Sequence, residues 1–278
     1  AEKIGRLAVT FAEYGNKAET VKLGLSLMSL FNLSGNEAVC NLLRIMGHCE
    51  EFTDYVISNT TGWSDEKKQD LYFELAKKLR GWGKINVVEM MQADTKEKKD
   101  WLLCHGCKNN IMYAYLGFEC AMKCDLYERL QNGNFSDEEF LGASDIMSGL
   151  LDEGPCQGMS ALEYPIELTL LYLEECKKHN WDAEQVALIT DIAVYFRSSE
   201  IENADKIEPK VKEVLERLDI HNYILENIEN NTHECMHIAK IYDVDMSEHL
   251  IRLMKMDFEK YYNFCYYLFN RQQNVDEF

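Results

Sequence analysis

A recurring signal for the start of a helix constrains this chain more than any other feature. Four segments begin with Ser or Asp and carry Glu or Gln three residues later, namely Ser34 with Glu37, Asp94 with Glu97, Ser136 with Glu139 and Asp182 with Gln185. In such a capping box, each of the two side chains accepts a hydrogen bond from a backbone amide near the helix start. Ser64 offers a simpler N-cap. We therefore expect helices to begin at these five positions.

The segments between these positions carry apolar residues at the spacing of an α-helix. Three such stripes are Leu71, Tyr72, Leu75, Ala76 and Leu79; Ile111, Tyr115, Phe118 and Met122; and Val211, Val214, Leu215 and Leu218. A half-buried strand would instead alternate apolar and polar residues, and the sequence lacks that pattern. Only three prolines and 15 glycines are present in 278 residues. The sequence predicts an all-α fold with no β-sheet.

Gly81 is predicted to end one of these helices. Lys77, Lys78 and Arg80 precede it, and positive charge is favourable near the negative end of a helix. A glycine just beyond the last turn can adopt the positive φ that such a position often needs.

The predicted helix starts lie 30, 30, 42 and 46 residues apart, which suits one helical hairpin per interval. This spacing favours an α-solenoid, a right-handed stack of antiparallel hairpins, over a compact irregular helical domain with the same apolar stripes. We expect the stack to cover residues 1–200. Residues 201–278, which begin within the acidic stretch SSEIENADKIEP (residues 198–209), either continue the stack or include a small helical module after that stretch.

The segment GWGKINVVEMMQADTKEKKDWLLCHGCKNNIMYAYLGFECA, residues 81–121, resembles HEAT-type repeats and is similar to segments of bacterial HEAT-like repeat proteins. The resemblance is close here and weaker over about 200 residues. It implies a curved stack of helix pairs that binds partners, and it carries over no catalytic residue. Trp82, Lys84, Asn109 and Tyr113 lie at turns or helix starts of this segment and are the predicted binding residues.

The charge of the chain indicates which partners suit it. Asp and Glu number 48 against 29 Lys and Arg, a net charge of −19. Such a surface repels phosphate backbones, so we expect no nucleic-acid binding and a basic protein or peptide as partner. The favoured function is a non-enzymatic protein-binding scaffold without a cofactor.

The ten cysteines follow no disulfide framework, which is typical of reduced, intracellular proteins. No apolar run is as long as a membrane span, and no signal-like segment begins the sequence. These features predict a cytoplasmic protein that does not bind membranes.

Cys104, Cys107, Cys120 and Cys124 have a spacing close to that of structural zinc sites. A helix starting at Asn109 or Asn110 would place Cys120 roughly 15–20 Å along its axis from Cys107. That separation excludes one shared ion, so the four cysteines are interpreted as buried packing residues.

Residues 233–237 read His-Glu-Cys-Met-His, the H-E-x-x-H pattern of zinc hydrolases. In this alternative, His233 and His237 bind zinc, Glu234 is the general base, and His249, Glu259 or Glu248 supplies a third ligand.

A structural interpretation of the same residues competes with the zinc site. Asn231 would cap a helix that begins at Thr232, and Glu234 would reach back to the amide of Asn231. No strand precedes the motif to hold a substrate backbone. We favour the capped helix.

Residues 258–269, FEKYYNFCYYLF, are rich in aromatic side chains. Phe258, Tyr261, Tyr262, Cys265, Leu268 and Phe269 form one helical stripe. A helix with aromatic residues on all sides is either buried in a core or covers a partner, and we favour the core.

Overall fold

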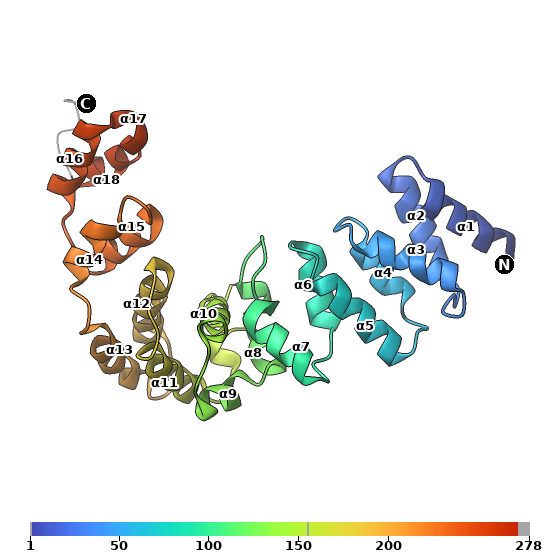
Figure 1. Cartoon of the computed structure of the whole chain (residues 1–278), viewed down its shortest axis with the longest axis horizontal. Helices are drawn as coiled ribbons and strands as arrows, with labels where there is room; N and C mark the ends of the chain where they lie inside the picture. Colours follow the sequence, from blue (N-terminus) through green and yellow to red (C-terminus); the bar gives the residue numbers. More distant parts are fainter. Residues whose placement is uncertain (1, 155, 272–278) are drawn as a thin grey trace. The chain divides into compact units, whose positions relative to one another are not determined.

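The computed structural model describes residues 2–154 and 156–271. Within these ranges every regular element is a helix, so the all-α prediction is confirmed (Figure 1). The chain divides into two compact units, Ala1–Leu168 and Thr169–Phe278. The boundary between the two units falls inside a helix.

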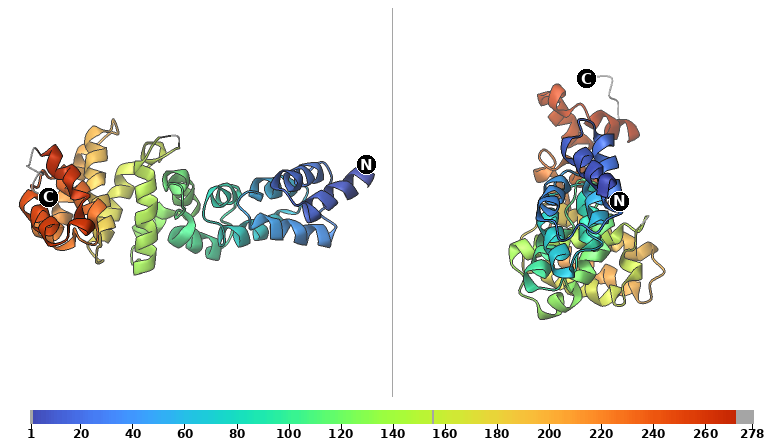
Figure 2. Two further views of the ribbon diagram at one scale, coloured as in Figure 1. Left: turned by 90° about the horizontal axis from the view of Figure 1, so that it is seen from above. Right: turned by 90° about the vertical axis from the view of Figure 1, so that its right-hand side faces the viewer.

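The first unit consists of short helices that pack on their neighbours in the chain. Its elements are α1 (Glu2–Tyr14), α2 (Ala18–Met28), α3 (Glu37–Gly47), α4 (Thr53–Asn59), α5 (Asp65–Ala76), α6 (Trp82–Met90), α7 (Lys96–Trp101), the π-helical turn η1 (Leu102–Gly106), α8 (Ala114–Lys123), α9 (Leu126–Asn132), α10 (Asp137–Leu151), the 3₁₀ turn η2 (Met159–Ala161) and the start of α11 (Pro165–Cys176). Helices α1 and α2, α3 and α4, α5 and α6, and α8 and α10 form packed pairs. Contacts of α2 with α4, α4 with α6, and α6 with α8 join each pair to the next (Figure 2).

The second unit contains the rest of α11 and the C-terminal helices. These are α12 (Ala183–Ser198), the 3₁₀ turn η3 (Ala204–Lys206), α13 (Ile207–Leu215), α14 (Ile220–Asn227), α15 (Thr232–Ile241), α16 (Ser247–Met256), α17 (Phe258–Tyr261) and α18 (Phe264–Asn270). Helix α12 packs on both α13 and α15, and α16 packs on α17 and α18. The acidic stretch near residue 200 therefore connects two helices that pack together.

Two of the four predicted capping boxes are present. The Ser136 side chain accepts from the Glu139 amide and the Glu139 carboxylate accepts from the Ser136 amide; Asp182 and Gln185 form the same pair. The other two starts are wrong by one or two residues, because a nearer polar side chain takes the cap. Asn36 caps α3, and Thr95 caps α7. Ser64 occupies the N-cap position of α5 without a capping hydrogen bond.

Gly81 was predicted to end a helix with a positive φ, and this prediction is wrong. Gly81 is instead the N-cap of α6, with φ −108°. Its lack of a side chain matters because a Cβ there would lie 2.8 Å from a carboxylate oxygen of Glu50. That carboxylate accepts hydrogen bonds from the amides of Arg80, Gly81 and Gly83 at 2.7–2.8 Å. Burial raises the pKa of Glu50, but these three bonds outweigh it and hold the pKa below its usual value. Glu50 thus caps α6 from a distant part of the sequence.

Candidate functional site

Trp82 and Lys84, two of the predicted binding residues, lie in different environments. The indole of Trp82 is 50% exposed and packs edge-to-face on Tyr115 at 4.9 Å between ring centroids. Lys84 is only 6% exposed, and its ammonium donates hydrogen bonds to the carbonyl oxygens of His105 and Lys108 at 2.7 and 2.5 Å. Burial lowers the pKa of Lys84. Trp82 is therefore available at the surface, whereas Lys84 closes the end of η1.

The other two predicted residues organise the turn before α8. The Asn109 side chain accepts hydrogen bonds from the amides of Ile111 and Met112 at 2.9 and 2.8 Å. The half-buried Tyr113 precedes the first residue of α8, and its carbonyl oxygen accepts from the amide of Gly117. The helix expected from residue 109 or 110 therefore begins at Ala114, because Asn109 stabilises a turn in place of the first helical residues.

Three of the four clustered cysteines are buried. Cys107 lies near Cys120, whereas it was expected to lie far from it along one helix. A Cβ on Gly106 would lie 2.8 Å from the sulfur of Cys120, so the turn after η1 brings Cys107 and Cys120 into the same core. Cys107, Cys120 and Cys124 are buried free thiols, and Cys104 is partly exposed. Burial raises the pKa of all four, to about 12 for Cys120 and about 11 for Cys104. These thiols pack as small apolar groups.

Helix α15, which carries His233 and His237, begins at Thr232 as predicted. The predicted capping box is absent, since the Asn231 side chain makes no capping hydrogen bond. His233 has a side chain 93% exposed, with its Nδ1 atom 3.8 Å from Glu234. His237 instead places Nε2 2.6 Å from Asp191 of α12.

The three proposed third ligands of zinc lie on other helices. His249 is on α16, and its Nε2 atom is buried without a hydrogen-bond partner in the described part of the chain. Burial lowers the pKa of this imidazole. Glu248 and Glu259 are exposed on α16 and α17. Among residues 2–154 and 156–271, no three His, Cys, Asp or Glu side chains gather so as to hold a metal ion, so the ligands named for the zinc alternative do not lie together.

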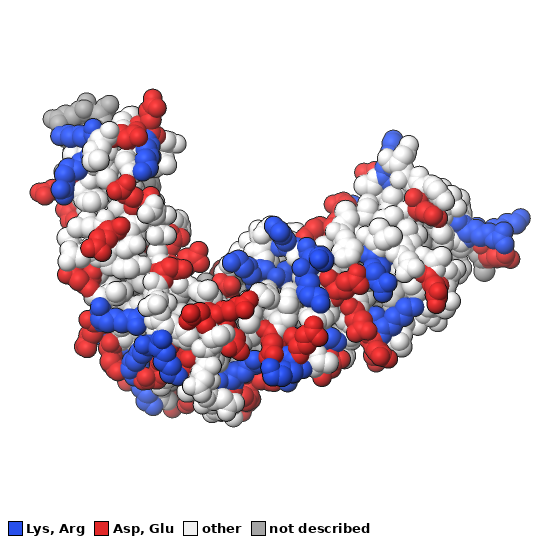
Figure 3. Space-filling model, viewed as in Figure 1, with Lys and Arg blue, Asp and Glu red and all other residues white. Residues whose placement is uncertain are grey.

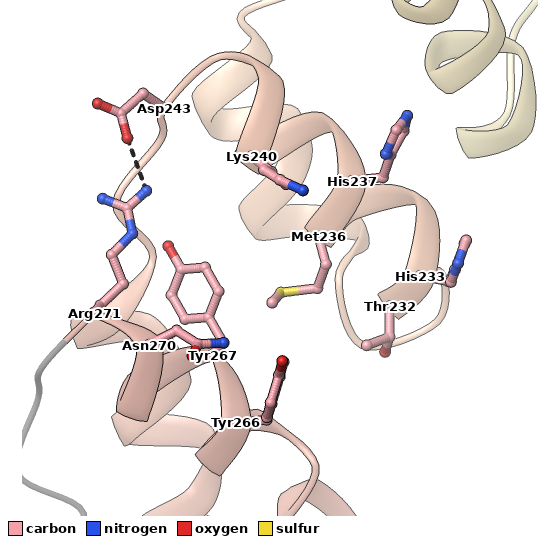
Figure 4. A pocket seen from close by; sticks show the side chains of 10 residues that line it. All are labelled: Thr232, His233, Met236, His237, Lys240, Asp243, Tyr266, Tyr267, Asn270 and Arg271. Carbon is pink, nitrogen blue, oxygen red and sulfur yellow. Dashed lines mark hydrogen bonds and ion pairs between the residues drawn. The ribbon is translucent and has the colours of Figure 1, made fainter.

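Helices α15 and α18 border a groove of about 920 Å³. In Figure 4, Met236 projects from α15 toward Tyr266 and Tyr267 of α18, whereas His237 points away from α18. The hydroxyl of Tyr267 is fixed because it donates to the carbonyl of Val244 and accepts from an amide, each at 3.2 Å. The groove therefore has an aromatic and methionine wall, and the two histidines of the motif, His233 and His237, also border it.

The aromatic segment 258–269 is only partly a core element. Tyr261, Phe264 and Leu268 are buried, and Tyr261 and Phe264 stack at 5.8 Å. Four other aromatic residues of this segment are exposed: Phe258, Tyr262, Tyr266 and Phe269. The predicted stripe is thus divided between the core and the surface, because the chain turns between α17 and α18.

Acidic residues are unevenly distributed along the chain. Residues 1–118 contain 15 acidic and 15 basic side chains, whereas residues 119–278 contain 33 acidic and 14 basic ones. Within the first unit, residues 119–168 hold 11 acidic side chains against only Lys123 and Arg129. Charges of both signs are interspersed on the face drawn in Figure 3. The acidic excess therefore does not form one uninterrupted patch on that face.

One small pocket in the first unit is lined only by residues of the acidic segment 119–168, and we call it the tyrosine pocket. It has a volume of about 210 Å³ and is lined by Ala121, Met122, Asp125, Leu126, Tyr127, Glu128, Leu162, Glu163, Tyr164 and Leu168. Asp125 adopts the left-handed conformation, with φ 56°, and turns the chain sharply from α8 into α9. This turn brings Tyr127 against Tyr164, which directly precedes α11, and the rings stack at 5.1 Å with 21° between their planes.

Three carboxylates surround these stacked rings. Asp125 pairs with Lys99, and Glu163 accepts a 2.7 Å hydrogen bond from the hydroxyl of Tyr164. That bond raises the pKa of Tyr164, which keeps the phenol neutral. In the described part of the chain, neither Glu128 nor Glu163 forms an ion pair, and no lysine or arginine lines the pocket. The site is thus aromatic and anionic.

The tyrosine pocket has only a weak signal in the sequence. The local signal is a tyrosine next to a glutamate, in Tyr127-Glu128 and again in Glu163-Tyr164. In the sequence alone, a glutamate next to a tyrosine is common and does not indicate a binding site. Only the tertiary fold brings the two rings together.

Comparisons of the chain with protein-family models, with curated proteins and with solved structures find no match. Among the residues that the structure describes, no helix combines the length and apolar character needed to cross a bilayer.

Proposed function

We propose that the chain is a non-enzymatic scaffold that binds a basic protein or peptide through acidic side chains of residues 119–278. The observation that carries this proposal is the uneven charge, since the whole excess of −19 lies in that part of the sequence. A basic partner would be attracted to it by long-range electrostatics and then held by local contacts.

The packing of the first unit supports an α-solenoid of the HEAT-like kind. Its helix pairs α3–α4 and α5–α6 contact each other through α4 and α6, and α6 contacts the next pair through α8. Pairs that contact mainly their sequence neighbours are typical of solenoids, which offer extended surfaces to partners. Trp82, with its exposed ring, is the best placed of the four residues expected to bind.

A zinc hydrolase is less well supported. Such an enzyme needs three protein ligands around one open metal position. His237 faces Asp191, His233 is directed into solvent, and His249 is on another helix with a buried nitrogen. These positions do not favour the hydrolase.

The test measures binding of a labelled peptide of alternating Lys and Ser by fluorescence anisotropy. We expect binding that weakens strongly between about 0.05 and about 0.3 M salt, because salt screens charges on exposed side chains. An acidic peptide of the same length should not bind. Equal binding of both peptides, or none at low salt, would contradict the proposal.

A pair of matched variants locates the effect. Glu138→Gln, Asp152→Asn and Glu167→Gln together remove three exposed charges from residues 119–168 outside the tyrosine pocket. The control, Glu13→Gln, Glu19→Gln and Asp70→Asn, removes three exposed charges from residues 1–118. Both sets remove three negative charges and should weaken peptide binding slightly for that reason. Only the first set should weaken the binding further.

A further inference from the structure

The tyrosine pocket has the composition of a site for a single cationic side chain. Ala121, Leu126 and Leu168 are buried and form its apolar floor. Tyr164 is 45% exposed and Tyr127 is partly buried, so Tyr164 is the more accessible ring of the stacked pair. The exposed Glu128 and Glu163 lie at the rim.

The size of the pocket excludes most small-molecule ligands. Its volume of about 210 Å³ is below the ~300–1,000 Å³ typical of sites for drug-sized ligands. A long side chain that protrudes from a bound partner needs less space. Its apolar stem can cover Met122, which is 57% exposed, and Leu162.

The lining selects a cation for two independent reasons. The face of a tyrosine ring is electron-rich and attracts a cation within about 6 Å of its centroid. The carboxylates of Glu128 and Glu163 add negative charge, and no lining residue is a lysine or arginine that would compensate for it. Glu163 accepts one hydrogen bond from Tyr164, and a bound cation would supply the positive charge that both carboxylates lack.

The shape of the aromatic wall favours a guanidinium over an ammonium. The planes of Tyr127 and Tyr164 differ by only 21°, so each stacked ring covers one face of the other. A ligand therefore meets a single flat outer ring face, which does not surround a point charge from several sides. A planar guanidinium stacks on such a wall and still donates hydrogen bonds in its own plane to carboxylates at the rim. The chain uses the same arrangement internally, where Arg217 lies 3.2 Å from the ring centroid of Trp181.

We propose that the tyrosine pocket receives an arginine side chain of the basic partner, stacked on Tyr164 and hydrogen-bonded to Glu128 and Glu163. This inference rests on the proposed function, because it supplies the local contact by which the acidic scaffold recognises a basic protein or peptide. The guanidinium is the recognised group.

The first test compares three labelled peptides of equal length, in which every third residue is Arg, Lys or citrulline and the others are Gly and Ser. We expect the Arg peptide to bind about three- to tenfold more tightly than the Lys peptide, and the neutral citrulline peptide not to bind measurably. Equal affinity for the Arg and Lys peptides would overturn the arginine assignment.

Variants then place the preference in the pocket. Tyr164→Leu keeps an apolar group but removes the exposed ring, and it should weaken Arg-peptide binding between about two- and tenfold while leaving Lys-peptide binding nearly unchanged. Tyr164→Phe keeps the ring and should retain the preference for arginine. Tyr14→Leu, which removes an exposed tyrosine of α1, is the matched control. A preference for arginine that survives Tyr164→Leu would contradict the inference.

A second measurement avoids any change to the pocket. Methyl-labelled methionine spectra of the unaltered chain, titrated with N-acetyl-arginine amide, should show the signal of Met122 shift while that of Met90, also exposed, does not. Shifts at neither methyl group would overturn the inference.

The two proposals fail in distinguishable ways. If basic peptides bind with the expected salt dependence but without dependence on Tyr164, the pocket is not the contact and the scaffold proposal stands. If neither the Arg nor the Lys peptide binds at low salt, the proposed function itself is wrong.

Discussion

The ammonium of Lys84 donates a 2.7 Å hydrogen bond to the carbonyl oxygen of His105, so a residue of α6 closes the end of η1. A second bond reaches the carbonyl of Lys108, and the ring of Trp101 lies 5.2 Å from the same ammonium. The last carbonyls of a helix have no partners inside it, and a buried cation satisfies them. Lys84 thus ties α6 to the π-helical turn that precedes α8.

Lys84→Met should therefore destabilise the first unit by about 1–3 kcal/mol, because it leaves two partly buried carbonyls without their charged donor. The measurement is the urea midpoint followed by circular dichroism. Lys108→Met, which removes a nearby exposed lysine, should change the midpoint little. If both variants unfold at the wild-type midpoint, the ammonium does not support the turn.

Glu50 gives the stability a pH dependence of known sign. The pKa of the Glu50 carboxyl is lower in the folded chain than in the unfolded chain. Glu50 therefore stabilises the fold fully above its unfolded pKa, and this stabilisation is lost as pH falls through its folded pKa. Glu50→Gln should lower the melting temperature at about pH 7, consistent with a cap worth roughly 0.5–1 kcal/mol. The difference from wild type should shrink as pH falls and disappear below the folded pKa, where the carboxyl is protonated. Asp70→Asn is the control, and an equal shift in both variants at pH 7 would contradict this role.

The buried thiols should resist chemical modification while the chain is folded. Burial raises the pKa of Cys107, Cys120 and Cys124, and only the thiolate reacts rapidly. Titration with a disulfide reagent at about pH 8 should modify the exposed Cys49 quickly and these three only after unfolding. The raised pKa values of these buried thiols also predict that the free energy of unfolding falls above the ordinary thiol pKa of about 8.5. At such pH the unfolded thiols lose protons that the folded thiols retain. Rapid labelling of Cys120 in the folded chain would contradict the burial.

The helices were predictable because their signals are local. The boxes at Ser136 and Asp182 involve residues three apart, and both form as expected. The choice between Ser34 and Asn36 at α3 was not predictable in this way, since both residue types cap helices well and the fold decides which adopts the extended conformation.

The candidate site depends on contacts that the sequence does not reveal. Tyr127 and Tyr164 are 37 residues apart, and their stacking follows from the left-handed Asp125 and the path of the chain into α11. Likewise, Cys107 and Cys120 share a core because a turn organised by Asn109 reverses the chain, which a single helix from residue 109 would not do. In both cases tertiary packing overrides the local pattern.

The H-E-x-x-H motif allows a direct test of the alternative function. We expect elemental analysis of protein purified without a histidine tag to find no stoichiometric zinc, because His237 is engaged by Asp191 at 2.6 Å and His233 projects into solvent. His233→Ala and Glu234→Gln should leave both the helical content and the melting temperature unchanged. His237→Gln should cost less than about 1 kcal/mol, since its ion pair is partly exposed on both sides. About one zinc per chain, lost on His233→Ala, would instead require His233 and His237 to turn toward a common ion and would make a hydrolase the leading function.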